Sequence, residues 1–307
     1  MRVVSLGSKV EMRQLMRAAA MAASLVPMNA SADGARDWLN VPVDMNFIYL
    51  YYTYNKGESS IDTSLPITGA STEASVPVVR YARSFDVGGK IGGVQLIVPY
   101  AFTEFELDGT RINRSVDGIG DIQAVVIANL LGAPALSREE FARWSPETYL
   151  TASVAVKAPT GRYDPNRLVN IGANRWAFKP QLSYGIPLKP DEWLTFNGNI
   201  EFFTDNDRYR GVSTLSQNPL ATVEAHYSRN LTRALWLSAD AYYSYGGETS
   251  VNSIGRDDTQ STLKLGVSGS LNLTPADAIA VSATHSVWKR DYTPDTFTLA
   301  INYNHAW

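Results

Sequence analysis

Residues 296–307 read TFTLAINYNHAW, and this stretch decides the fold. Its apolar side chains recur at every second position from Phe297 to Trp307, and polar or small residues fill the positions between them. Successive side chains of a β-strand point to opposite faces, so this pattern predicts a strand with one apolar and one polar face. The same period of two returns in 262–273 and in 278–288.

Turn residues divide the rest of the chain into strands of the same kind, about twelve in all. The predicted strands are 44–55, 76–86, 92–104, 119–131, 147–158, 174–187, 192–205, 217–229, 234–246, 258–273, 278–288 and 295–307. Short connections tend to follow the even-numbered strands. Long polar connections mostly follow the odd-numbered ones, at 56–75, 105–118, 159–173, 206–216 and 247–257. Two connections break the rule: 132–146 is long, with a helix expected at Arg138–Arg143, and 289–294 is short.

An even number of strands with alternating short and long connections is typical of a bacterial outer-membrane barrel. Hydrocarbon offers no hydrogen-bond partner, so a membrane-spanning sheet must close on itself. The sequence therefore predicts an all-β fold, a closed antiparallel transmembrane β-barrel of about 12 strands surrounded by outer-membrane lipids. A soluble secreted β domain would also alternate. The last strand disfavours it, because its final Trp307 resembles the C-terminal signal read by the barrel assembly machinery.

The first 32 residues have the pattern of a cleaved signal peptide. Four basic residues precede the uncharged run AAAMAASLVPMNASA at 18–32, whose final Ala30-Ser31-Ala32 fits a signal-peptidase site. The apolar run 18–28 is too short to span a bilayer, which takes about 20 residues. We expect cleavage after Ala32, which leaves 33–307 as the outer-membrane barrel; Met12 is an alternative start.

Composition excludes several other classes of protein. The chain has 27 Lys and Arg against 30 Asp and Glu, without a basic cluster, so no nucleic-acid partner is expected. It has no cysteine and only 3 histidines, far apart in sequence, so neither a metal site nor a cofactor is expected. His285 and Ser286 are adjacent and would face opposite sides of one strand, and His226 has no nucleophile constellation. We do not expect an enzyme.

Three sequence runs carry a family resemblance: DGIGD at 117–121, VKAPTGRYDP at 156–165 and NIGANRWAFKP at 170–180. In sequence and order they resemble the outer-membrane transporter family labelled "putative meta-pathway of phenol degradation". The matching residues are Gly118, Gly120, Asp121, Lys157, Pro159, Thr160, Gly161, Asn170, Gly172, Trp176 and Pro180. The resemblance implies a barrel that admits aromatic or other hydrophobic small molecules.

These motif residues have a structural interpretation and a functional one. Proline and glycine end strands and permit tight bends at a barrel rim, and this interpretation is favoured for most of them. Asp121 is the favoured exception, because it belongs with Gln123 to the side that should face the lumen.

If the apolar set faces lipid, several charged residues must line the lumen. A Lys or Arg on the lipid face costs about 2–4 kcal/mol near the midplane. The expected lumen and selectivity residues are Arg80, Asp121, Lys157, Lys179, Glu201, Glu224, Asp240 and Lys264. They could form a filter with a basic and an acidic arc, or neutralise one another in pairs such as Lys179 with Glu201. Four inward aromatic residues could form an apolar track or fill the barrel: Trp193, Phe203, Trp236 and Tyr242.

The function that follows is passive uptake of a small hydrophobic solute, including aromatic compounds. Twelve strands lie between the filled barrels of eight strands and the open pores of sixteen, so a narrow lumen is expected. The stretch from Asp33 to Pro42 is too short for a plug domain. The alternative is a structural or adhesive barrel that transports no solute and acts through its long loops.

Overall fold

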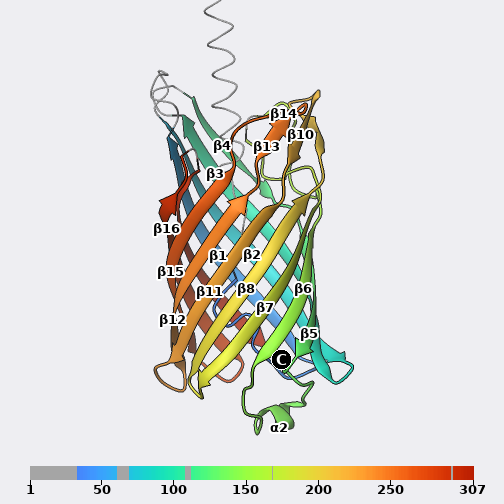
Figure 1. Cartoon of the computed structure of the whole chain (residues 1–307), viewed down its shortest axis with the longest axis vertical. Helices are drawn as coiled ribbons and strands as arrows, with labels where there is room; N and C mark the ends of the chain where they lie inside the picture. Colours follow the sequence, from blue (N-terminus) through green and yellow to red (C-terminus); the bar gives the residue numbers. More distant parts are fainter. Residues whose placement is uncertain (1–32, 61–68, 108–111, 168, 292) are drawn as a thin grey trace, which may run out of the picture.

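The computed structural model describes residues 33–60, 69–107, 112–167, 169–291 and 293–307, and the predicted signal peptide at 1–32 lies outside these residues. The described residues form a tall, closed, antiparallel β-barrel (Figure 1). Its wall consists of β1 (Asn46–Ser60), β2 (Gly69–Val87), β3 (Lys90–Leu107), β4 (Ile112–Ile119), β5 (Gln123–Leu131), β6 (Tyr149–Lys157), β7 (Ala177–Lys189), β8 (Glu192–Phe203), β11 (Leu220–Asn230), β12 (Leu235–Gly246), β15 (Gln260–Asn272), β16 (Asp277–Lys289) and β17 (Asp295–Ala306).

The barrel closes because β1 pairs with β2 on one side and with β17 on the other. Beyond the last ladder pair, the backbone amides of Asn46 and Trp307 each donate to the other residue's carbonyl at 3.0 Å. Both β4 and β5 pair with β3 at successive positions, so they are one wall strand interrupted at 120–122. The wall therefore has 12 strands, and the predicted fold class is confirmed.

The two faces of the wall differ as the alternation predicts. On the outer face Leu265 is 48% exposed, Val267 63% and Ile301 48%. On the inner face Glu224 is only 4% exposed. A continuous band of exposed apolar side chains around a closed sheet is the surface that such a barrel presents to lipid.

One end of the barrel carries short connections and the small helix α2 (Arg138–Phe141). Gly88 and Gly89 form the two-residue turn between β2 and β3 with φ of 62° and 84°, and a left-handed turn of this kind matches the twist of a hairpin. Ser137 and Glu140 form a capping box at the start of α2, and the hydrogen bond from the Ser137 backbone lowers the pKa of Glu140. The helix expected at Arg138–Arg143 is thus present over 138–141. Among the described residues, no helix has the length and apolarity needed to cross a membrane.

The opposite end, here called the outer end, differs from the prediction in two ways. β1 continues to Ser60, β2 begins at Gly69 and β3 reaches Leu107, so much of the loops expected at 56–75 and 105–118 is strand. The loops expected at 206–216 and 247–257 contain hairpins. Their strands form a separate four-stranded sheet, seen at the top of Figure 1: β9 (Asn206–Tyr209), β10 (Ser213–Gln217), β13 (Thr249–Val251) and β14 (Ile254–Gly255). Strands that project beyond the bilayer need no apolar outer face, so these segments carry no signal of alternation.

The position of the lipid band predicts the effect of a new charge on β17. We expect Leu299→Arg to lower the free energy of unfolding by about 2–4 kcal/mol, because Leu299 is 43% exposed on the outer face. Urea unfolding in lipid vesicles measures this loss. The matched control is Ala300→Arg, one residue away on the inner face, which should cost less than half as much. Equal losses would contradict the assignment of the two faces.

Candidate functional site in the barrel lumen

A short segment that precedes β1 fills part of the barrel. Residues 33–42, here called the lumen segment, contact β2 through Asp37, β7 through Asp33 and β11 through Arg36. β2 lies across the closed sheet from β7 and β11, so a segment that touches all three must run inside it. The stretch is too short for a plug domain, as expected, but as a short segment it still occupies part of the lumen.

Arg36 ties the lumen segment to β11 and β12. Its guanidinium donates through Nε to Ser228 Oγ at 3.0 Å and through Nη1 to Asn230 Oδ1 at 2.6 Å. It also lies over the ring of Trp236, 4.9 Å from the centroid. Burial lowers the pKa of Arg36 to about 10, so the side chain stays charged at neutral pH.

Asp37 and Asp33 tie the same segment to the other walls. Asp37 Oδ2 lies 3.7 Å from Arg80 Nη1 on β2. The Asp33 carboxylate accepts from Trp38 Nε1 at 2.9 Å and from the side-chain amide of Gln181 on β7. These polar contacts join the segment to both sides of the barrel and hold it there without a covalent link.

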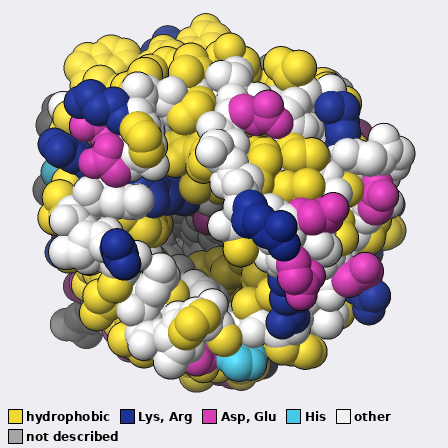
Figure 2. Space-filling model, turned by 90° about the horizontal axis from the view of Figure 1, so that it is seen from below, with side chains coloured by type: hydrophobic (Ala, Val, Ile, Leu, Met, Phe, Trp, Pro, Cys, Tyr) yellow, Lys and Arg dark blue, Asp and Glu magenta, His cyan; other side chains and the backbone are white. Residues whose placement is uncertain are grey.

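At the short-turn end, the lumen segment packs against apolar side chains. Trp38 and Leu39 lie against a cluster that contains Tyr149 and Trp193. Asn40 donates to the carbonyl of Pro134 at 3.0 Å, which anchors the segment to the turn that carries α2. Figure 2 views the molecule from this end and shows a hollow at its centre, ringed by charged and apolar side chains.

The three motif runs meet at the outer end of the lumen. Asp121 is 7% exposed, and its two carboxylate oxygens accept the backbone amides of Gly161 and Ala173, each at 2.8 Å. Thr160 Oγ1 accepts the amide of Ile122 at 2.9 Å. Asp121 was expected to be the motif residue that faces a solute, but its carboxylate is used to hold the connection 158–176 against the wall.

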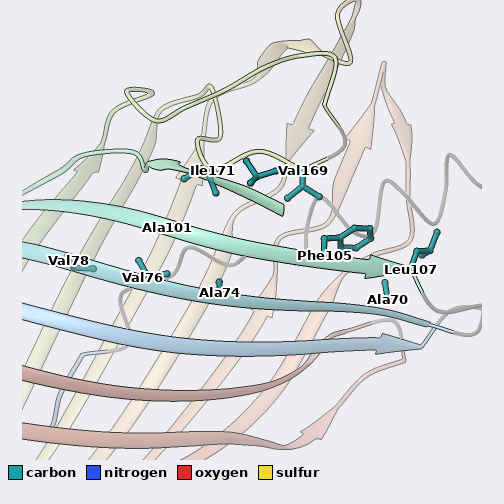
Figure 3. Packing of buried hydrophobic residues seen from close by; sticks show 10 residues of the cluster. Ala70, Ala74, Val76, Val78, Ala101, Phe105, Leu107, Val169 and Ile171 are labelled. Carbon is teal, nitrogen blue, oxygen red and sulfur yellow. The ribbon is translucent and has the colours of Figure 1, made fainter. Parts of the chain in front are cut away.

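Two glycines bring the parts of this connection together. A Cβ on Gly161 would lie 2.7 Å from the Cα of Gly172, and a Cβ on Gly172 would meet the backbone of Gly161 at 2.7 Å. Either clash involves backbone atoms, so glycine is required at both positions. The close approach turns Val169 and Ile171 onto the inner wall, where both are buried beside Ala101 and Phe105 of β3 (Figure 3).

The expected lumen charges are mostly engaged with partners. Lys157 Nζ lies 3.2 Å from Glu201 Oε1, whereas the pair expected for Glu201 was with Lys179; that pairing is wrong. Lys157 on β6 reaches across β7 to β8, a contact that spacing along one strand does not reveal. No ion pair involves Lys179 or Lys264 within the described part of the chain, although both have the inner-face parity of their strands.

Glu224 and Asp240 share His226, which is not among the lumen residues expected from the sequence. His226 Nδ1 lies 2.8 Å from Asp240 Oδ1, and its Nε2 lies 3.4 Å from Glu224 Oε2. Asn197 donates to Glu224 at 2.8 Å, and Ser238 donates to Asp240 at 3.1 Å. The signal was present in the sequence, because Glu224 and His226 stand two residues apart on one face of a strand.

The four inward aromatic residues are packing residues rather than an open track. Trp193 lies against Tyr149 with ring centroids 6.1 Å apart, and Arg175 covers Phe203 at 4.6 Å. Trp236 is covered by Arg36, and Tyr242 donates to the carbonyl of Asp33 at 3.4 Å. All four are therefore occupied by other parts of the chain.

The profile of the family described as "Putative MetA-pathway of phenol degradation" matches residues 55–303. The chain belongs to this family. No curated protein sequence matches it. The crystal structure of the COG4313 outer membrane channel from Pseudomonas putida F1 has a similar fold, with a TM-score of 0.77 and 18% identity over 90% of this chain and 100% of that one.

Two autotransporter barrels are more distant in structure. The transport unit of AIDA-I from Escherichia coli gives a TM-score of 0.52 at 8% identity, over 94% of this chain and 95% of that one. The beta domain of the Bordetella autotransporter BrkA gives 0.51 at 9% identity, over 86% and 100%. These likenesses show the fold alone. With its closed wall and apolar outer band, this member of the phenol-degradation family is a protein of the bacterial outer membrane.

Not every family-motif residue joins the convergence at Asp121. Asn170 accepts the amide of Asp164 at 2.8 Å and so braces the connection 158–176 from within. Gly118 has a φ of 155° beside the side chain of Arg162, and Gly120 donates to the carbonyl of Pro99 at 2.8 Å. Three motif residues lie elsewhere: Lys157 points to Glu201, while Trp176 and Pro180 are exposed. Pro159 lies in the connection just after the end of β6.

The tryptophans and the catalytic candidates lie as follows. Trp176, Trp288 and Trp307 are exposed, whereas Trp193 and Trp236 face inward, as the sequence predicted for these two. The side chain of His285 is 58% exposed and Ser286 is buried, so they lie on opposite faces. Among the described residues, no group of three or more His, Asp or Glu is placed to hold a metal ion.

The Asp121 carboxylate should keep the connection 158–176 in its fixed position. In Asp121→Asn one of the two acceptor oxygens becomes an amide nitrogen that cannot accept a hydrogen bond, so we expect a loss of about 1–3 kcal/mol in stability. Hydrogen exchange should rise in 158–176 and little elsewhere. Asp117→Asn is the control, since Asp117 is half exposed and pairs with Arg162 at 3.7 Å. Unchanged exchange in Asp121→Asn would contradict the role assigned to this carboxylate.

Weakening the lumen segment should widen the conducting path. We expect the double variant Arg36→Ala with Asp37→Ala to raise single-channel conductance severalfold, because it removes the contacts with Ser228, Asn230 and Arg80. Planar-bilayer recordings measure this change. Arg138→Ala with Glu139→Ala in the exposed α2 is a charge-matched control. The assignment fails if the two double variants conduct equally.

Proposed function

We propose that this protein is an outer-membrane channel for the passive uptake of small hydrophobic compounds, aromatic ones included. The observation that carries the proposal is the state of the lumen. It is occupied by two segments of the chain, the lumen segment and the connection 158–176, and not only by side chains of the wall. Segments held by non-covalent contacts can move aside and open a path through the lumen. In barrels of eight strands, by comparison, side chains of the wall fill the interior.

The family and fold are consistent with this function. The family description refers to phenol degradation, and the solved relative with the same fold is described as an outer membrane channel. We infer that the charges of the inner wall, Arg80, Asp121, Lys157, Lys179, Glu201, Glu224, Asp240 and Lys264, shape the potential along the path and hold the closing segments. Lys179 and Lys264 are the candidates for setting ion preference, because the other six have ionic or hydrogen-bonded partners.

Assembly of the barrel would use its last strand. Trp307 is 48% exposed at the end of β17, beside the seam with β1. We propose that this strand is the segment recognised by the barrel assembly machinery, and that outer-membrane lipids contact the apolar band.

Solute uptake into vesicles tests the channel function. Purified protein is inserted into vesicles whose outer leaflet contains lipopolysaccharide, which slows the unaided passage of apolar solutes, and the initial rates for phenol and glucose are compared. We expect phenol to enter at least several times faster than in protein-free vesicles, with glucose near background. Background rates for both solutes would overturn the proposal and leave the structural or adhesive barrel, for which the outer sheet β9–β10–β13–β14 would provide the surface.

A further inference from the structure

Three aromatic rings form a ladder on the inner face of β1. The rings of Phe47 and Tyr49 stack with centroids 6.3 Å apart and planes at 22°, and those of Tyr49 and Tyr51 with centroids 6.0 Å apart at 21°. The alternate residues Leu50 and Tyr52 are 48% and 50% exposed on the outer face. The ladder therefore faces the lumen, and it runs along the strand from the short-turn end toward the middle of the barrel.

The ladder continues into an apolar patch on the neighbouring strands. Tyr51 and Ile97 pack against the buried cluster of the outer end, which is visible in Figure 3. The cluster on β2, β3 and β4 consists of Ala70, Ala74, Val76, Val78, Ala101, Phe105, Leu107 and Val116, together with Val169 and Ile171 of the connection 158–176. From Phe47 to Leu107 the inner face of these strands thus forms a largely apolar arc, here called the β1–β4 arc, in which Thr72, Arg80 and Thr103 are polar exceptions.

The opposite inner wall is polar. On β7, β8, β11 and β12 the buried inward side chains include Gln181, Ser183, Thr195, Asn197, Asn199, Glu224, His226, Ser228, Ser238 and Asp240. In a lumen with one polar and one apolar arc, a solute can keep its polar side hydrogen-bonded while its apolar side is removed from water. Removing apolar surface from water is favourable, so an apolar solute favours the β1–β4 arc.

Arg80 stands at the junction of the ladder and the patch. Its guanidinium lies 4.9 Å from the centroid of Tyr49 and donates to the hydroxyl of Tyr51 at 3.1 Å. Its Nε is buried and has no hydrogen-bond partner among the described residues. A buried donor without a partner is unfavourable, so a solute oxygen that displaces the atoms covering this Nε would satisfy it.

We propose that the β1–β4 arc is the binding path for an aromatic solute, with Tyr49, Tyr51 and Arg80 as its central subsite. This inference rests on the proposed function and places its solute. The solute ring stacks on the tyrosine ladder, and an oxygen substituent accepts from Arg80 Nε. The lumen segment and the connection 158–176 both lie along this path. Asp37 contacts Arg80 near the middle of the path, and Val169 and Ile171 cover its outer end.

The proposed path is not the aromatic track expected from the sequence. Trp193, Phe203, Trp236 and Tyr242 are each in contact with another part of the chain, and Trp193 and Tyr242 are only 5% and 7% exposed. Phe47, Tyr49 and Tyr51 keep part of their surface accessible, as do Phe203 and Trp236. The accessible aromatic surface of the lumen therefore includes the ladder on β1.

A pair of membrane-impermeant anions tests the site. Benzenesulfonate and cyclohexanesulfonate have the same charge and similar size, but only the first has a flat aromatic ring. Their permeability ratio is measured from reversal potentials in planar bilayers. We expect the wild-type protein to favour benzenesulfonate, and Tyr49→Leu with Tyr51→Leu to reduce that preference about threefold to tenfold, because leucine has no face on which a ring can stack.

Two further variants control for folding and for general effects. Tyr52→Leu with Tyr54→Leu makes the same change on the same strand, at positions of outer-face parity, and should keep the wild-type ratio. Tyr49→Phe with Tyr51→Phe keeps both rings and should keep most of the preference. Heat-modifiable migration on gels establishes that each variant has closed its barrel.

The outcomes separate this inference from the proposed function. If phenol enters vesicles but the ratio is the same in the leucine variant and the wild type, the site is wrong and the channel function stands. A wild-type ratio of one also overturns the site. A protein that admits neither anion, and phenol only at background rate, contradicts the channel function as well.

Discussion

The backbone hydrogen bonds of a sheet in hydrocarbon must all be made within the sheet, and the rest of this structure depends on that constraint. The seam between β1 and β17 meets it, and Asn46 and Trp307 extend the seam with a further pair of backbone hydrogen bonds. A closed wall has one face in lipid, so every charge within the membrane must point inward. The inner face therefore collects polar groups that need partners, and partners must come from inside the barrel.

The lumen segment is one source of those partners. Arg80 would be a buried cation on an apolar arc without Asp37, and Ser228 and Asn230 gain a charged donor in Arg36. The wall supplies other pairs by itself, as in Lys157 with Glu201 and in His226 between two carboxylates. An interior organised by hydrogen bonds and ion pairs costs desolvation, but it allows a short segment of chain to occupy the lumen in one defined position.

The sequence predicted the strands whose alternation the membrane requires, and it missed the strands that lie beyond the bilayer. Alternation along 262–273 and 295–307 located β15 and β17, because lipid requires an apolar residue at every second position there. The extensions of β1 and β2 beyond the bilayer, and the hairpins at 206–217 and 249–255, carry no such requirement and looked like loops. Contacts between distant segments could not be predicted either. The pairing of Lys157 with Glu201 and the position of Arg36 depend on how the wall closes, and the residues next to them in sequence do not show this.

The lumen segment and the connection 158–176 are held by different kinds of contact, and this difference bears on which solutes could pass. The lumen segment is held largely by ion pairs and hydrogen bonds, which water and ions weaken and an apolar solute does not. The connection 158–176 is fixed at its base by Asp121, while Val169 and Ile171 cover the β1–β4 arc through apolar contacts. An apolar solute can replace those contacts with its own surface, so displacing the two side chains costs it little free energy. A sugar would have to lose water without replacing them, and this difference supports the proposed preference for hydrophobic solutes.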